Sequence, residues 1–133
     1  MRFAFKELPG RSGDSRRPVV PVSVEGLERV PLFALVDTGS LQNRFGRWVA
    51  EAAGINLEGA DRERIGLGGF ASIEGLTVPV RLAIEDAEWE APVSFCDPWP
   101  FDFQLLGQEG FFRWFRVLFR AADAVVEVTL EER

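Results

Sequence analysis

Alternating apolar and polar residues dominate the first part of the chain and predict β-strands. Residues 2–6 alternate with two phenylalanines on one side, which predicts a half-buried strand at the edge of a sheet. Two further apolar runs, residues 19–24 and 31–36, flank the turn Glu25-Gly26. Strands separated by a short glycine-containing turn are typical of a β-hairpin, so we expect these two runs to pair.

The strand pattern continues beyond residue 76. Residues 77–84 and 88–95 predict two more strands. Pro92 favours an edge position or a bulge for the second of them, because proline cannot donate a ladder hydrogen bond. Residues 103–107 predict a short buried strand that is closed by Gly107.

The last part of the chain predicts a short helix followed by a hairpin. Residues 110–115 are almost all apolar and predict a brief, mostly buried helix. Residues 116–120 and 124–130 predict a terminal hairpin, in which Val126, Val128 and Leu130 share a face.

A second helix is predicted directly after residue 40. Apolar residues recur there at helical spacing: Leu41, Phe45, Trp48, Val49 and Ala52. Gly54 is a suitable C-terminal stop for this helix. A tryptophan on such a stripe usually packs in the core, so we expect Trp48 to be buried.

Composition indicates one folded domain over residues 1–133. The 133 residues are 47% hydrophobic, which is enough for a sizeable core. The net charge of −6 argues against nucleic acid as a partner, because such binding depends on clustered Lys and Arg. The basic cluster Arg11, Arg16 and Arg17 lies in residues 9–18, which are rich in Gly and Ser and predict a flexible, solvated loop.

Several kinds of chemistry are excluded by residues that are missing. The chain has no His and a single Cys96, which rules out an internal disulfide, a Ser-His-Asp triad and a zinc-hydrolase site. We therefore expect neither a metal nor a cofactor. No stretch approaches the roughly 18 apolar residues of a membrane helix, so we expect a soluble, cytoplasmic protein without a membrane partner.

The motif Asp37-Thr38-Gly39-Ser40 is the best candidate for chemistry. It follows the apolar run 31–36 directly, which predicts a tight turn with the carboxylate at its exposed tip. One carboxylate can accept a proton but cannot supply one at the same moment, and the motif occurs once in the chain. The partner acid is therefore expected from a second copy of the chain.

Two other aspartates are candidates for an in-chain second acid. Asp97 and Asp102 flank residues 98–101, but neither follows an apolar strand nor precedes Thr/Ser-Gly. Turn residues of this type usually make local hydrogen bonds, so we favour a structural role for both.

A glycine-rich segment is the second unusual feature. Within residues 64–75 lie Gly66, Leu67, Gly68, Gly69 and Phe70, a composition that favours a flexible, apolar hairpin whose backbone approaches another molecule closely. A phosphate-binding loop would need a helix to follow it, whereas the next residues are strand-like. Nucleotide binding is therefore disfavoured.

These landmarks, in this order, resemble the retropepsin-like aspartic proteases. The Asp37 motif resembles the catalytic signature of that family, residues 64–75 resemble its flap hairpin, and Leu105-Leu106-Gly107 resembles the strand that supports the catalytic loop. Gln108 stands where many retroviral members have Arg. The resemblance implies a mainly β fold, a closed or orthogonal barrel-like single lobe with a flap hairpin and one or two short helices.

The resemblance also implies a mechanism and a partner. Asp37 of each subunit of a homodimer would activate water and hydrolyse a peptide bond, with the two acids exchanging the roles of acid and base. Thr38 would hydrogen-bond across the dimer, and Gly39 would let substrate and water approach. Ser40 would donate a hydrogen bond to the outer carboxylate oxygen, which favours the charged form and shifts activity toward acidic pH.

Substrate and alternative function follow from the same comparison. Leu67 and Phe70 of the flap, with strand residues such as Ile84, would line an apolar cleft for extended peptides with hydrophobic side chains. Hairpin packing is an equally good explanation for Phe70. The alternative function is a catalytically silent peptide-binding or dimerisation module with the same fold. The intact motif favours the enzyme, because a binding module does not need a costly pair of acids.

Overall fold

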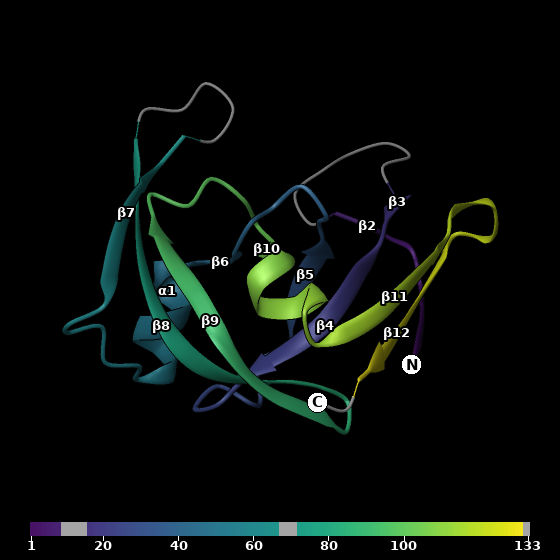
Figure 1. Cartoon of the computed structure of the whole chain (residues 1–133), viewed down its shortest axis with the longest axis horizontal. Coiled ribbons are helices and arrows are strands. Elements are labelled where there is room, and N and C mark those ends of the chain that lie inside the picture. The colour runs from purple at the N-terminus through teal and green to yellow at the C-terminus, as the bar shows by residue number, and fades with distance from the viewer. Residues whose placement is uncertain (9–15, 67–71, 132–133) are drawn as a thin grey trace.

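The chain folds around a closed β-sheet, and the computed structural model describes residues 1–8, 16–66 and 72–131 (Figure 1). The largest sheet has seven strands in the order β4-β5-β10-β6-β9-β8-β7, and a further pairing of β4 with β8 closes it into a barrel with β7 outside the ring. Its strands are β4 (Val19–Val24), β5 (Leu32–Val36), β6 (Asn43–Gly46), β7 (Asp61–Ile65), β8 (Ile73–Ile84), β9 (Ala87–Asp97) and β10 (Gln104–Leu106). The fold is therefore mainly β, as predicted.

Two smaller sheets and three short helices complete the described fold. A three-stranded sheet has the order β1-β12-β11, and a two-stranded sheet joins β2 to β3. The strands are β1 (Arg2–Ala4), β2 (Lys6–Glu7), β3 (Arg16–Arg17), β11 (Phe115–Arg120) and β12 (Val125–Leu130). The helices are α1 (Arg47–Ala53), the π-helix η1 (Gln108–Phe112) and the 3-10 helix η2 (Ala121–Asp123). None of the helices in the described ranges has the length and apolar character needed to span a bilayer.

The main core lies inside the closed sheet and is rich in aromatic rings. Trp89 of β9 is 3% exposed, and its ring lies edge-on to Phe115 with the centroids 4.7 Å apart. The Trp89 indole Nε1 donates a hydrogen bond of 2.8 Å to the Gly110 carbonyl of η1. Phe111 of the same helix stacks on Phe115 at 4.7 Å. Burial of these side chains fixes η1 against the barrel and so fixes the residues that precede it.

Most predicted strands are confirmed, and their pairing follows the hydrophobic pattern. β4 and β5 form the expected antiparallel hairpin, with Val19 opposite Leu35. β11 and β12 form the expected terminal hairpin, and Val126 and Val128 are fully buried on one face of it. β1 is at an edge, as expected, since it pairs only with β12 in its sheet.

The predicted helix after residue 40 was wrong in its first half. Residues 43–46 form β6, which pairs in parallel with β9 and also contacts β10, and the helix begins only at Arg47. Ladder hydrogen bonds to two neighbouring strands outweigh the helical stripe in this segment. The shorter helix buries Val49 and Ala50 instead, so Trp48 is 48% exposed and the prediction that it lies in the core was also wrong.

The position of Pro92 fits the prediction, whereas the ends of two segments differ from it. Pro92 stands opposite Pro79 of β8 and lies one residue before the pairing of β9 with β6 begins at Val93, so it is paired on one side only, as the expected edge position requires. Two prolines can face each other at a non-hydrogen-bonded position of an antiparallel pair, because the two opposed residues do not donate N–H groups to each other there. The predicted helix at 110–115 begins two residues earlier, and Phe115 already belongs to β11. Residues 16 and 17 of the predicted loop form β3, while residues 9–15 lie outside the described residues.

Candidate active site

The loop that carries Asp37 is fixed by the strand before it. β5 buries Leu32, Ala34 and Val36 in the main core, so the chain leaves the barrel at a defined point. β10 runs parallel to β5, with Leu106 in register with Val36. The ladder continues one step further, because the Asp37 N–H donates a hydrogen bond of 3.0 Å to the Leu106 carbonyl. Asp37 therefore begins the loop from a rigid position.

The loop itself turns tightly around the Asp37 carboxylate. The Gly39 N–H donates to Asp37 Oδ1 at 2.9 Å, and the Ser40 N–H donates to the Asp37 carbonyl at 3.1 Å. A Cβ on Gly39 would lie 3.2 Å from the same Oδ1, a tight contact that the carboxylate would have to relieve by a small shift. Asp37 is partly buried, while Thr38 and Gly39 are exposed. The carboxylate is thus oriented by a backbone donor at the surface of the chain.

The predicted contact of Ser40 with the carboxylate was wrong. Ser40 is 7% exposed, and its hydroxyl donates a hydrogen bond of 2.6 Å to the Gln42 carbonyl instead. Gln42 lies directly before β6, and the Ser40 hydroxyl turns into the protein to supply a donor for its carbonyl. In this structure Ser40 therefore stabilises the loop and does not tune the acid.

We expect Ser40→Ala to reduce stability without moving the pH profile. The lost hydroxyl leaves a carbonyl without its donor, so the free energy of unfolding should fall by about 1 kcal/mol. Chemical denaturation measures this loss, and Ser23→Ala is a suitable control, because the Ser23 hydroxyl makes only a long contact of 3.5 Å with the Ala83 carbonyl. A shift of the acidic limb of the activity profile in Ser40→Ala would contradict this assignment.

Leu105, Leu106 and Gly107 lie directly beside the loop. The Gln108 N–H that follows them donates to the Ser40 carbonyl at 2.8 Å. Gly107 has no room for a side chain, since an added Cβ would meet the Gln42 carbonyl oxygen and would lie 2.5 Å from the Ser40 carbonyl oxygen. The segment predicted to support the loop thus contacts it through backbone on both sides.

Three polar side chains hold this arrangement, and the sequence did not single out their contacts. Gln108 Nε2 donates a hydrogen bond of 2.8 Å to the Thr38 carbonyl, so a neutral amide holds the loop at this position. Asn43 is fully buried, and its Oδ1 accepts a hydrogen bond of 3.0 Å from Gly107. Gln104 is 2% exposed, and its Oε1 accepts a hydrogen bond of 2.8 Å from the Gly46 N–H. The available signal was a polar residue inside an apolar strand, which indicates a required internal partner.

The structure describes only the base of the predicted flap. β7 and β8 pair antiparallel up to Ile65 opposite Ile73, and Gly66 follows as an exposed residue. Leu67, Gly68, Gly69 and Phe70 lie outside the described residues. Ile84, which was expected to line the cleft, is fully buried in the main core next to the β8–β9 turn, so that expectation was wrong. It sits at the far end of the long β8, where the barrel is closed by β4.

Other titratable groups near the barrel are less suited to chemistry. Asp97 and Asp102 are exposed at the ends of the 98–101 turn. Cys96 is fully buried, and burial raises the pKa of its thiol against a smaller opposing effect of the Ser94 hydroxyl. It is therefore a neutral thiol at physiological pH and a weak nucleophile.

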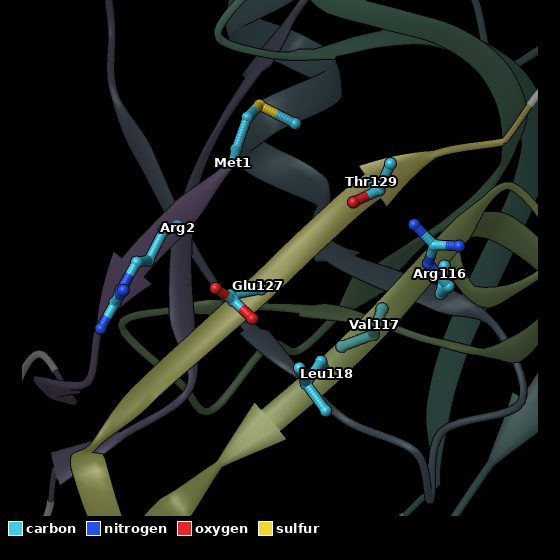
Figure 2. Close-up of a pocket in the computed structure, with 7 residues that line it drawn as sticks. All are labelled: Met1, Arg2, Arg116, Val117, Leu118, Glu127 and Thr129. Atoms are coloured by element: carbon cyan, nitrogen blue, oxygen red, sulfur yellow. The ribbon is translucent and has the colours of Figure 1, made fainter.

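A hollow elsewhere on the described surface does not involve the loop. It has a volume of about 540 Å³ and lies over the three-stranded sheet, where Glu127 stands between Arg2 and Leu118 (Figure 2). Arg2 is directly opposite Glu127 in the ladder, and Leu118 is opposite it on the other side. This hollow belongs to a different sheet from the one that carries Asp37.

The closed sheet, the loop at the end of β5 and the β7–β8 hairpin define the fold of a retropepsin-like aspartic protease. The fold is similar to the crystal structure of a retropepsin-like aspartic protease from Rickettsia conorii, with a TM-score of 0.60. The two sequences are 16% identical, and the match covers 97% of this chain and 98% of that one. No protein-family model and no curated protein sequence matches the chain.

Proposed function

We propose that the protein is an aspartic endopeptidase whose active site forms between two copies of the chain. The observation that carries the proposal is the Asp37 carboxylate, held by the Gly39 N–H at 2.9 Å on a loop at the end of a parallel strand pair. The retropepsin-like fold supports it independently. Together they pair a suitable acid with a scaffold suited to peptide hydrolysis.

The chemistry needs two acids that share one proton. One carboxylate takes a proton from water, which attacks the peptide carbonyl, while the other donates a proton to the carbonyl oxygen. The first acid then gives its proton to the amide nitrogen as the C–N bond breaks, and the second takes a proton back from the diol. Two carboxylates in contact do not both ionise readily, so their titrations separate and the apparent pKa values belong to the pair. Activity is therefore expected to rise and fall again with pH as the pair passes through its singly protonated form.

A homodimer is the simplest source of the second acid. The motif occurs once per chain, and a twofold axis beside the loop would bring one Asp37 from each copy together. Thr38 and Gly39 are exposed in the single chain, which leaves them accessible to a partner. In this proposal Thr38 makes the hydrogen bonds between the two loops.

The substrate in this proposal is an extended peptide segment. An extended chain pairs with strand edges through its backbone, and its side chains occupy alternate subsites. Residues 66–70, most of which lie outside the described residues, keep the substrate-binding role implied by the resemblance.

Cleavage of an unfolded protein, assayed from acidic to neutral pH over a range of enzyme concentrations, tests this function. We expect products of endoproteolysis, with activity per mole of chain rising as concentration favours the dimer. Binding of the unfolded protein without any cleavage at all concentrations would instead support the non-catalytic module.

A further inference from the structure

The face of the large sheet that carries Asp37 also carries a buried cation. Leu35 of β5 is in register with Leu105 of β10, Leu105 is opposite Arg44 of β6, and Arg44 is in register with Ser94 of β9. Paired residues on neighbouring strands project to the same face, and side chains alternate along each strand. Asp37 follows Leu35 by two residues, so its position and that of Arg44 belong to the same face.

Arg44 forms an ion pair across this face. The side chain of Arg44 is 10% exposed, and its Nη1 lies 3.0 Å from Glu63 Oε1 on β7 and 3.4 Å from Ser94 Oγ. β9 and β8 lie between the two strands of the pair. A Cβ on Gly75 of β8 would lie 2.5 Å from Ser94 Oγ and 3.4 Å from Glu63 Cγ. Gly75 and Ser94 therefore leave the space in which the two charged side chains meet.

The two partners of this ion pair differ in their exposure. The Glu63 side chain is 39% exposed, whereas Arg44 is almost completely desolvated. Both hydrogen bonds from Arg44 to oxygen acceptors in the described residues leave from the same atom, Nη1. A guanidinium can bind a carboxylate through two parallel N–H groups, so Arg44 has further capacity for an acidic ligand.

We propose that Arg44 is a specificity-determining residue that binds an acidic side chain of the peptide substrate in place of Glu63. This proposal rests on the endopeptidase function. Displaced Glu63 returns to water at small cost, because its side chain is already 39% exposed. The buried Arg44 keeps a charged partner, since the acidic side chain of the substrate replaces Glu63. A basic side chain would draw Glu63 away and leave a buried cation unpaired, which is strongly unfavourable.

The position of the cation fits a peptide in the site. Arg44 lies two strands away from the strand that leads to Asp37, and it is level with Leu35, two residues before Asp37. At ordinary sheet spacing the backbones of Arg44 and Asp37 are therefore about 12 Å apart. An extended peptide advances about 3.3 Å per residue, so the acidic side chain falls within about four residues of the cleaved bond.

Peptides that differ by a single Glu, Gln or Lys at each of the positions around the cleaved bond test the proposal. At one position we expect kcat/KM for Glu to exceed that for Gln by about tenfold, with Lys below both. Arg44→Met should abolish this preference, so that the Glu and Gln peptides are cleaved with equal kcat/KM. Arg44→Lys should keep part of the preference, and Glu63→Gln should increase it. Equal cleavage of the Glu and Gln peptides at every position, or an unchanged preference in Arg44→Met, would overturn the proposal.

Binding of the same peptides to Asp37→Asn separates this inference from the catalytic one. Fluorescence anisotropy of the labelled peptides needs no turnover, and we expect tighter binding of the Glu peptide that is lost when Arg44→Met is added. Cleavage without any preference for Glu overturns only the role of Arg44. Arg44-dependent binding of the Glu peptide, with no cleavage by the original protein, overturns only the hydrolysis.

Discussion

Asp37→Asn is expected to abolish peptide cleavage, with kcat/KM falling by about 10³-fold or more, the scale of losing a general acid–base group. The amide cannot exchange protons as the carboxylate does, although it has almost the same shape. Its oxygen can still accept the Gly39 N–H bond that orients the Asp37 side chain. The fold should therefore be preserved, and the cleavage assay with matched thermal unfolding measures both properties.

Asp97→Asn and Asp102→Asn are the matched controls for this variant. Both residues are exposed aspartates near the loop that precedes β10, and both were weighed as an in-chain second acid. We expect both control proteins to cleave peptides at nearly the original rate. Full activity in Asp37→Asn would exclude Asp37 from the mechanism. Loss of activity in either control would instead indicate a second acid within the same chain.

Gly107→Ala is expected to have the largest effect on the structure. The backbone at Gly107 has φ −126° and ψ −168°, which any residue adopts, so the cost comes only from space. The new Cβ would meet carbonyl oxygens of both Gln42 and Ser40, which are backbone atoms that cannot rotate away. We expect the free energy of unfolding to fall by about 3 kcal/mol and cleavage to fall with it, because the Asp37 loop must shift.

Gly59→Ala separates this packing effect from a general effect of removing glycine. Gly59 has φ +75°, and a Cβ there would have no neighbour within 4 Å. Gly59→Ala should lower the free energy of unfolding by about 1 kcal/mol through backbone strain alone, and activity should be retained. Denaturant unfolding of the two variants compares these costs directly. A Gly107→Ala protein as stable as Gly59→Ala would mean that the contact between Gly107 and the loop is loose.

Period-two patterns predicted the strands well because burial decides the structure of alternating segments. β4, β5, β11 and β12 follow their apolar residues, and their hairpin partners are close in sequence. The pattern failed after residue 40, where a helical stripe overlaps a strand. Asn43–Gly46 pair with β9 and β10, which lie about fifty to sixty residues further along the chain, and local spacing does not report such partners.

The sequence predicted only those parts of the candidate site that lie within short continuous motifs. Asp37 to Ser40 and Leu105 to Gly107 stand out as motifs, and the structure places these two segments side by side. The contact between Gln108 and Thr38 joins residues 70 positions apart, and that between Asn43 and Gly107 joins residues 64 apart. Hydrogen bonds of this kind depend on the final fold. The direction of the Ser40 hydroxyl was missed for a different reason: the Asp37 carboxylate and the Gln42 carbonyl are both near Ser40 in sequence, so the sequence does not choose between these two acceptors.

Mixing the original protein with Asp37→Asn tests most directly whether one active site needs Asp37 from two copies. At fixed total concentration, and after subunit exchange, only dimers with two aspartates should cleave, so activity should fall with the square of the fraction of original chains. An equal mixture should then retain about one quarter of the activity. If the equal mixture retained about one half of the activity, and activity fell linearly with the fraction of original chains, each chain would act alone. That result would contradict the account.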